Sequence, residues 1–173
     1  MFHTIRRRIH DARTISWLCR EAEQAARTRG QARPGSEHFV LAALGLPDGS
    51  GRTAFGMLGI DAAGYADALD RLDTRALEDI GIATGAIPTR PQVAGPAPRL
   101  FQGQPSAQTL IQRLADAKLT RQDRSLTGAD LLLMVAEEQH SPAVRAFLAL
   151  GVSPARLKEA AQRAIGEARS WHR

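Results

Sequence analysis

The chain aligns with itself without a gap when it is shifted by 92 positions, which places residues 14–73 on residues 106–165. The match is plainest where residues 53–60 face residues 145–152, and it keeps the apolar positions while the charged ones differ freely. A supersecondary unit that is used twice has, in each copy, an apolar face that it cannot bury alone. The duplication therefore favours a binding scaffold over an enzyme.

The composition is that of a folded globular protein. Of the 173 residues, 43% are hydrophobic and 24% are charged, which suits one ample core or two packed halves. The net charge of +5 comes mostly from arginine, because Lys118 and Lys158 are the only lysines. This basic excess permits contact with nucleic acid or an acidic partner without requiring either, and a GC-rich genome would give the same bias toward arginine and alanine.

Signals for export or membrane insertion are missing from the sequence. The longest apolar run, residues 131–136, is too short to span a bilayer, and no apolar stretch follows the basic residues 6–8. The lone cysteine, Cys19, aligns with Ile111 of the second copy, so we expect a small core side chain and not a catalytic thiol. We therefore expect a soluble cytoplasmic chain, monomeric because its two copies already pair internally.

Apolar residues recur with helical spacing in both copies. Ile15, Leu18 and Ala22 follow the pattern of an amphipathic helix, and Leu110 and Leu114 repeat it in the second copy. Three more helical segments follow in each copy, and no stretch alternates with the period of two that is typical of a strand. The predicted fold is therefore all-α, with two four-helix repeats related by a pseudo-twofold axis.

Helix ends and prolines divide the chain. Gly59 and Gly151 lie between apolar neighbours, which is the expected form of a left-handed C-cap with a hydrophobic contact across it. Five of the nine prolines fall in residues 87–105, which we expect to be a linker, and a short helix is predicted just before them. The predicted parts are a loosely docked N-terminal arm (1–11), a first repeat (12–73), a linker with a short helix (74–105), a second repeat (106–166) and a C-terminal tail (167–173).

The common catalytic and cofactor motifs are absent from the sequence. Residues 49–51 read Gly-Ser-Gly but lead into Arg52 and not into the lysine of a phosphate-binding loop, so we expect no nucleotide hydrolysis. The five histidines have neither cysteine partners nor the spacing of zinc ligands. We therefore expect no enzyme activity, no metal and no cofactor.

Ser36, Glu37 and His38 are consecutive, which invites a catalytic interpretation. Adjacent residues on a helix point in different directions, however, so they cannot form a nucleophile–base pair by themselves. We expect Ser36 to be an N-cap and Glu37 to lie in the first turn, where the helix dipole favours a negative charge by roughly 0.3–1 kcal/mol. Thr127 and Asp130 have the T-x-x-D spacing of a capping box for the equivalent helix of the second copy.

The same segment carries a family signature. Residues 35–44 read Gly-Ser-Glu-His-Phe-Val-Leu-Ala-Ala-Leu, which resembles the G-[ST]-E-H-[ILV]-L-L-[AG]-L signature of the Clp amino-terminal repeat domain. A small-residue turn, an Ala-Phe-x-x-Leu-Gly-Ile segment and a second copy follow, so the resemblance covers residues 12–166. It implies a domain that binds substrate proteins or adaptors without catalysis, as at the front of the ClpA, ClpB and ClpC unfoldases. This chain lacks their AAA+ modules, so we expect a free-standing version of the domain.

The resemblance also implies binding residues. In ClpC-type domains the glutamate of each motif helps to hold phosphorylated arginine, a degradation mark, and Glu37 matches that position in the first copy. In the second copy Ala129 replaces the glutamate and Asp130 replaces the histidine. Half of the acidic site is therefore missing, and we expect any phosphoarginine binding to be weak and confined to the first copy. The opening Met-Phe is similar to the start of ClpC-type domains, which adds Phe2 to the candidate binding residues.

Two classes of function fit the sequence. The favoured one is a non-catalytic protein-binding module of the Clp chaperone and protease system, acting as an adaptor, a decoy receptor or a regulator of a partner unfoldase. Its partners would be substrate proteins, adaptors or the unfoldase itself. The alternative is a basic helical nucleic-acid-binding protein. The arginines are scattered over all segments, with no interleaved aromatic residues and no helix-turn-helix signature, so this alternative has less support.

Overall fold

The computed structural model describes residues 2–81, 101–120 and 124–170, with side chains described for residues 9–81, 101–117 and 124–168. These residues form eight helices and no strand, which confirms the predicted all-α class. The helices are α1 (Phe2–Thr28), α2 (Ser36–Gly45), α3 (Ser50–Leu58), α4 (Ala62–Asp79), α5 (Pro105–Thr120), α6 (Gly128–Ala136), α7 (Pro142–Ala149) and α8 (Pro154–Ser170).

The two sets of four helices follow the sequence duplication. Helices α2, α3 and α4 begin at residues 36, 50 and 62, and α6, α7 and α8 begin 92 residues later at 128, 142 and 154. Contacts between the halves are crosswise, because α3 packs on α8, α4 packs on α7 and α2 packs on α6. When two halves are related by a pseudo-twofold axis, each contact between them is matched by a contact between the counterpart helices. The α3–α8 and α4–α7 contacts form such a pair, so the contact pattern supports the predicted pseudo-twofold relation.

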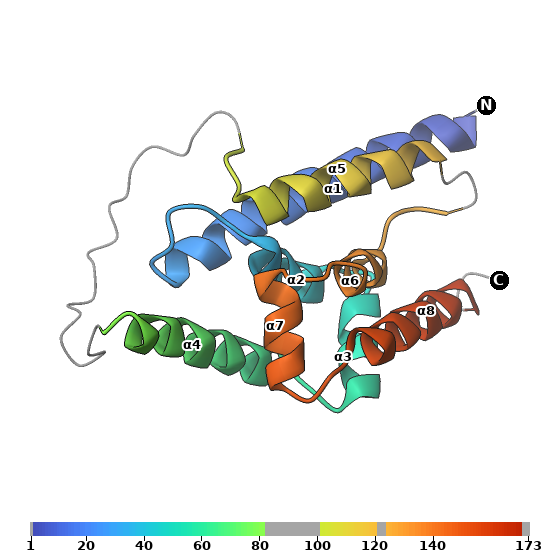
Figure 1. Cartoon of the computed structure of the whole chain (residues 1–173). Coiled ribbons are helices and arrows are strands. Elements are labelled where there is room, and N and C mark those ends of the chain that lie inside the picture. The colour runs from blue at the N-terminus through green and yellow to red at the C-terminus, as the bar shows by residue number, and fades with distance from the viewer. Residues whose placement is uncertain (1, 82–100, 121–123, 171–173) are drawn as a thin grey trace.

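The helices surround a buried central pair. Helices α1 and α5 run side by side along one side of the molecule, and α2 and α6 lie next to them in the middle (Figure 1). The remaining four helices form the opposite side (Figure 1). Helices α2 and α6 are apolar almost all round and almost completely buried, as expected of helices enclosed on every side. In the described part of the chain, no helix combines the length and apolarity needed to cross a membrane.

Aromatic rings from both halves meet in the centre of the core. The Phe55 and Phe147 rings occupy equivalent positions of the two repeats, and their centroids lie 5.7 Å apart in a T-shaped arrangement. Tyr65 packs against both, with its ring centroid 4.9 Å from that of Phe147 and 5.8 Å from that of Phe55. All three side chains are buried. The duplicated phenylalanine therefore joins the halves as well as stabilising each one.

The glycine-terminated helix ends are confirmed. Gly59 has the left-handed φ of 70°, and the Ile60 N–H donates to the Phe55 carbonyl oxygen at 3.1 Å. Gly151, its counterpart, has a φ of 73°. Glycine adopts this conformation without the steric penalty of a Cβ atom, which is why the pattern in the sequence is informative.

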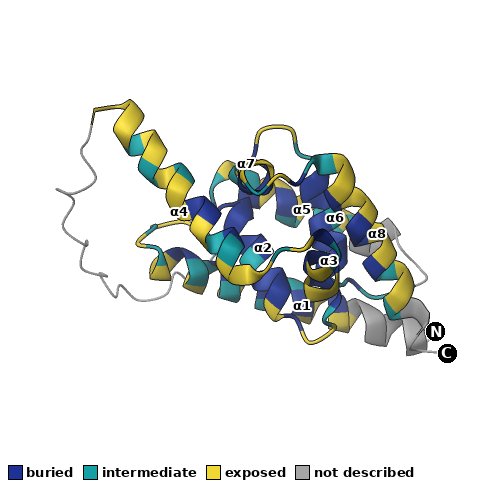
Figure 2. Cartoon of the chain, turned by 90° about the horizontal axis from the view of Figure 1, so that it is seen from below, coloured by how far each residue is buried: buried dark blue, intermediate teal, exposed yellow. Residues whose placement is uncertain are grey.

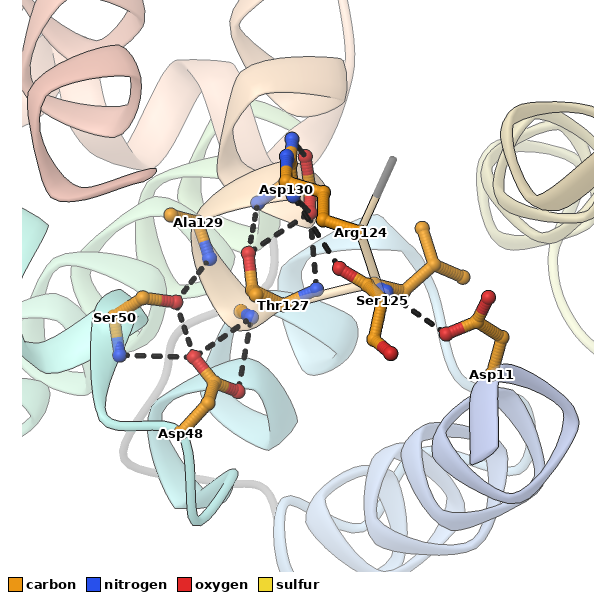
Figure 3. A network of polar contacts seen from close by, with 10 residues as sticks. Asp11, Asp48, Ser50, Arg124, Ser125, Thr127, Ala129 and Asp130 are labelled. Carbon is orange, nitrogen blue, oxygen red and sulfur yellow. Dashed lines mark hydrogen bonds and ion pairs between the residues drawn. The ribbon is translucent and has the colours of Figure 1, made fainter. Parts of the chain in front are cut away.

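The N-terminal segment differs from the expected loose arm. Helix α1 begins at Phe2, so residues 2–11 continue the first helix of the repeat without a break. The Asp11 side chain is buried, and its Oδ1 accepts a hydrogen bond from the Leu126 N–H at 2.9 Å (Figure 3). This contact fixes α1 to the loop before α6. The two residues are far apart in the sequence, so no local sequence pattern predicts that they meet.

The short linker helix is not a separate element. Residues 74–79 form the last turns of α4, because no glycine or proline interrupts them. The helix instead ends at Asp79 with Ile80 as its C-cap, and the next residue, Gly81, has a left-handed φ of 80°. The distal part of α4 is exposed on most of its surface (Figure 2). The proline-rich residues 82–100 lie outside the described residues. The last helix, α8, continues to Ser170, into the predicted tail.

The start of α6 receives groups from the other half. The Asp48 carboxylate accepts from the Gly128 N–H at 3.2 Å, and Ser50 Oγ accepts from the Ala129 N–H at 2.9 Å (Figure 3). A Cβ at Gly128 would lie 2.8 Å from the Ala43 carbonyl oxygen, so only glycine allows this approach. Two of the first N–H groups of α6 are thus satisfied across the interface between the halves.

Thr127 and Asp130 form the reciprocal pair that the sequence predicts. Thr127 Oγ1 accepts from the Asp130 N–H, and Asp130 Oδ2 accepts from the Thr127 N–H at 3.0 Å (Figure 3). The fully buried Asp130 carboxylate also forms an ion pair with the Arg124 guanidinium. A buried charge needs such a partner, so Arg124 is part of the cap.

Candidate functional site

The candidate site begins at the N-terminus of α2. Gly35 is the N-cap, and its N–H donates to His38 Nδ1 at 3.0 Å. The expectation that Ser36 is the N-cap is therefore wrong by one residue, and Ser36 is the first helical residue. Its hydroxyl oxygen is buried without a hydrogen-bond partner among the described residues. His38 is the N3 residue, and its imidazole accepts from the N-cap N–H as a glutamate does in a capping box.

Glu37 folds back over the N-cap instead of extending into solvent. Its side chain is 5% exposed, and Oε1 lies 3.0 Å from His38 Nδ1. A Cβ at position 35 would lie 2.8 Å from the Glu37 carboxyl carbon, so the glycine of the motif makes room for the carboxylate. The other oxygen, Oε2, is buried and has no hydrogen-bond partner in the described part of the chain. A buried carboxylate oxygen without a partner is unfavourable and points to an interaction still to be made.

The Glu37 carboxylate lines a small cavity between the two halves. The cavity has a volume of about 60 Å³ and is enclosed by α2, α4, α7 and the end of α1. Ligand pockets for whole small molecules measure roughly 300–1,000 Å³, so this space holds water or a single functional group. The charged and polar side chains that line it are Arg29, Gln31, Glu37, Asp73 and Arg145.

Arg29 connects α1 to α4 at the edge of the cavity. Its Nη2 atom lies 2.8 Å from Asp70 Oδ1 and 3.2 Å from Asp73 Oδ2, and its side chain is only 11% exposed. Its Nε is buried without a partner in the described residues. The guanidinium is therefore already paired with two aspartates.

A second carboxylate approaches from the other half. Burial raises the pKa of Glu138 above its ordinary value, the hydroxyls of Ser141 and Ser36 and the charge of Arg113 oppose this rise, and the negative charge of Glu37 adds a smaller one. Burial also raises the pKa of Tyr65 well above 10, and Glu37 and Glu138 both add to that shift. The Tyr65 hydroxyl lacks a hydrogen-bond partner among the described residues. Glu37, Tyr65, Glu138 and Ser36 thus form a buried polar cluster that crosses the interface between the halves.

The second half has no counterpart of this cluster. Ala129 stands at the position of Glu37 and is completely buried, and Asp130 stands at the position of His38. The Asp130 carboxylate is engaged by Thr127 and Arg124, so it is not available to a partner. The site is therefore one-sided, as the departure from the motif in the second copy suggests.

Two other predicted residues are placed differently. Phe2 begins α1, but its side chain lies outside the described residues. Cys19 is half-buried and packs against the core, and burial raises the pKa of its thiol to about 11. A thiol with such a high pKa is a weak nucleophile at neutral pH, in agreement with a packing role.

Sequence reasoning found Glu37 but missed Tyr65, Glu138 and Arg29. The signal that was present lies in the self-alignment, where a polar residue of one copy faces an apolar residue of the other. Tyr65 faces Leu157 and Glu138 faces Leu46 in this way. Such mismatches mark positions where packing alone does not explain the residue.

The comparison with protein families agrees with this architecture. The model of the Clp repeat N-terminal domain matches residues 16–150, which is most of the chain. The chain therefore belongs to the Clp repeat N-terminal domain family, and it is related to a protein-interaction module of the Clp system. A search of curated proteins finds no match to this chain. Among the described residues, no group of three or more His, Cys, Asp or Glu side chains could hold a metal ion.

Proposed function

We propose that this chain is a non-catalytic receptor of the Clp system, which binds a partner protein through Glu37 and serves as an adaptor, a decoy receptor or a regulator of an unfoldase. One observation carries the proposal: Glu37 lines a cavity between the halves, and its Oε2 is buried with no hydrogen-bond partner among the described residues. A helix cap does not require this arrangement, because His38 already accepts the Gly35 N–H.

The ligand that fits this carboxylate is a guanidinium group. Arginine donors match a carboxylate in a bidentate geometry, and such charge-assisted hydrogen bonds are the stronger ones in proteins. The cavity accommodates one functional group, so a larger ligand such as phosphoarginine needs α4 and α7 to move apart. With Ala129 in the second half, we expect a single weak site.

Calorimetry with phosphoarginine tests the proposal. The wild-type chain should bind one equivalent weakly, and Glu37→Gln should abolish this binding while its free energy of unfolding changes by at most about 1 kcal/mol. Glu159→Gln, an exposed carboxylate on α8, is the matched control and should bind like the wild type. Two equivalent tight sites would contradict the one-sided site. Binding that survives Glu37→Gln, or no binding at all, would leave Glu37 with only a structural role.

Capture from the native cell lysate tests the partner class. The wild-type chain should retain a Clp unfoldase, an adaptor or substrate proteins, and Glu37→Gln should retain several-fold less of the same proteins. Capture of nucleic acid in place of these proteins would support the alternative function.

A further inference from the structure

A second surface of the first half has the size of a binding site. An open groove of about 570 Å³ lies between α1, α2 and α4. This volume falls within the roughly 300–1,000 Å³ of typical ligand pockets and is far larger than the cavity at Glu37. The two sites lie on either side of Arg29, which lines both.

The groove has an apolar floor. Trp17 and Leu41 line it, and both are half-buried side chains at the edge of the core. Gly45 makes room for the indole, because a Cβ at that position would lie 2.9 Å from Trp17 Cη2.

The second half shows that the scaffold does not need this groove. At the equivalent positions Glu21 is replaced by Arg113, Gly45 by Glu137 and Ala66 by Lys158. Arg113 Nη1 donates to the Met134 carbonyl oxygen at 2.9 Å, and both Arg113 and Lys158 form ion pairs with Glu137.

These contacts link α5, α6 and α8 in the second half, whereas in the first half Arg29 links the end of α1 to α4 and the groove remains open beside it. Helix α8 also packs closely on α6, whereas α4 contacts α2 only lightly and leans toward α7. The same fold is thus closed on one side and open on the other, so the opening is a property of the residues in the first half.

The walls of the groove are acidic. Glu21 on α1 and Asp70 on α4 line it, with side chains that are 39% and 68% exposed. Between residues 61 and 79 there are six acidic residues and two arginines, a net charge of −4 in a chain whose total is +5. Within the groove, Arg29 is paired with Asp70, and outside it Arg20 is paired with Glu21. A partner that enters the groove therefore meets an apolar floor and, on the α4 side, an excess of negative charge.

We propose that the groove between α1, α2 and α4 binds a segment of a partner protein in which a bulky apolar side chain lies next to a lysine or arginine. The apolar side chain packs on Trp17 and Leu41, and the basic group lies between Glu21 and Asp70. The inference rests on the proposed function as a protein-binding module, but it concerns a different surface from Glu37.

Fluorescence of Trp17 provides a direct test. The chain has two tryptophans, so Trp171→Phe leaves Trp17 as the only reporter. Short synthetic peptides that combine leucine with arginine should shift the Trp17 emission to the blue in a saturable way. Matched peptides with leucine replaced by serine, or arginine replaced by glutamate, should not. Equal binding of the serine peptide, or no shift with any peptide, would overturn the proposal.

Variants in the same background locate the site. Gly45→Leu should remove the saturable response, because its side chain occupies the floor beside Trp17. Glu21→Gln and Asp70→Asn should each weaken binding about two- to five-fold, the effect of an exposed ion pair. Glu159→Gln is the matched control and should bind like the parent. Binding that is unaffected by Gly45→Leu would place the peptide elsewhere and refute the inference.

Two further controls separate the possible explanations. A blue shift on concentrating the protein without peptide would show that a second copy fills the groove, which would overturn the inference in favour of self-association. Glu37→Gln should leave peptide binding unchanged. If the peptide response fails while Glu37-dependent binding persists, this inference falls and the proposed function stands, and the reverse result would remove only the proposed function.

Discussion

Truncation of Phe147 tests the idea that the two halves share one core. The Phe147 side chain is 1% exposed and contacts the rings of Phe55 and Tyr65 from the other half. Removing a buried phenylalanine costs about 3–5 kcal/mol, which includes the cavity that remains. Since a domain of this kind has roughly 5–15 kcal/mol of total stability, Phe147→Ala should lose a large share of it.

The neighbouring residue supplies the control. Leu148 lies on the same helix but is 52% exposed, so Leu148→Ala should change the free energy of unfolding by no more than about 0.5 kcal/mol. Urea denaturation followed by circular dichroism measures both variants. At roughly 2–4 °C per kcal/mol, the melting temperature of Phe147→Ala should fall by about 6–20 °C.

A double-mutant cycle with Phe55 shows whether the halves are coupled. The two rings are 5.7 Å apart, so Phe55→Ala and Phe147→Ala should be non-additive by about 0.5–3 kcal/mol. The argument would be refuted if Phe147→Ala destabilised the protein no more than Leu148→Ala, or if the two phenylalanine variants were strictly additive.

Two further predictions concern the buried polar cluster. The folded-state pKa of Glu138 is raised above its ordinary value, so folding favours the protonated form of this carboxyl group. The free energy of unfolding therefore declines as the pH rises from the unfolded-state pKa through the folded-state pKa. Glu138→Gln should therefore be more stable than the wild type in urea at pH 7, and the gain should shrink in acid; an equal effect at both pH values would contradict this. Tyr65 is the only tyrosine, so tyrosinate absorbance reports on this residue alone. Because its pKa is raised, we expect this absorbance to appear only together with the alkaline loss of the helical circular dichroism signal. Ionisation of Tyr65 near pH 10 in the folded protein would contradict this prediction.

The comparison of the two halves explains how the site differs from its equivalent. At the start of α2 the Glu37 carboxylate has no use in the cap, whereas at the start of α6 the Asp130 carboxylate is held by Thr127 and Arg124. Duplication supplied two equivalent helix N-termini. At one of them the acid is part of the cap, and at the other one oxygen of a buried acid has no partner among the described residues.

The sequence alone determined the local features of the fold. The gapless self-alignment predicts four helices in each half, and the glycines at positions 59 and 151 end helices where their neighbours predict. It also identified Thr127 and Asp130 as a cap and Glu37 as the distinctive residue of the first copy. These features depend on residues within one or two helical turns, so periodicity and capping chemistry report them directly.

Only the tertiary structure decided which distant groups meet. The caps of α6 come from Asp48 and Ser50, about 80 residues earlier, and the N-terminal segment is held through Asp11 by the loop before α6. Tyr65 and Glu138 join Glu37 across the interface between the halves. A buried polar group takes whichever partner the packed helices bring within hydrogen-bond distance, and such partners leave no periodic trace in the sequence. For the same reason the sequence shows two equivalent halves, while packing leaves a groove beside Trp17 in the first half and places the Arg113–Glu137–Lys158 ion pairs at the equivalent position of the second.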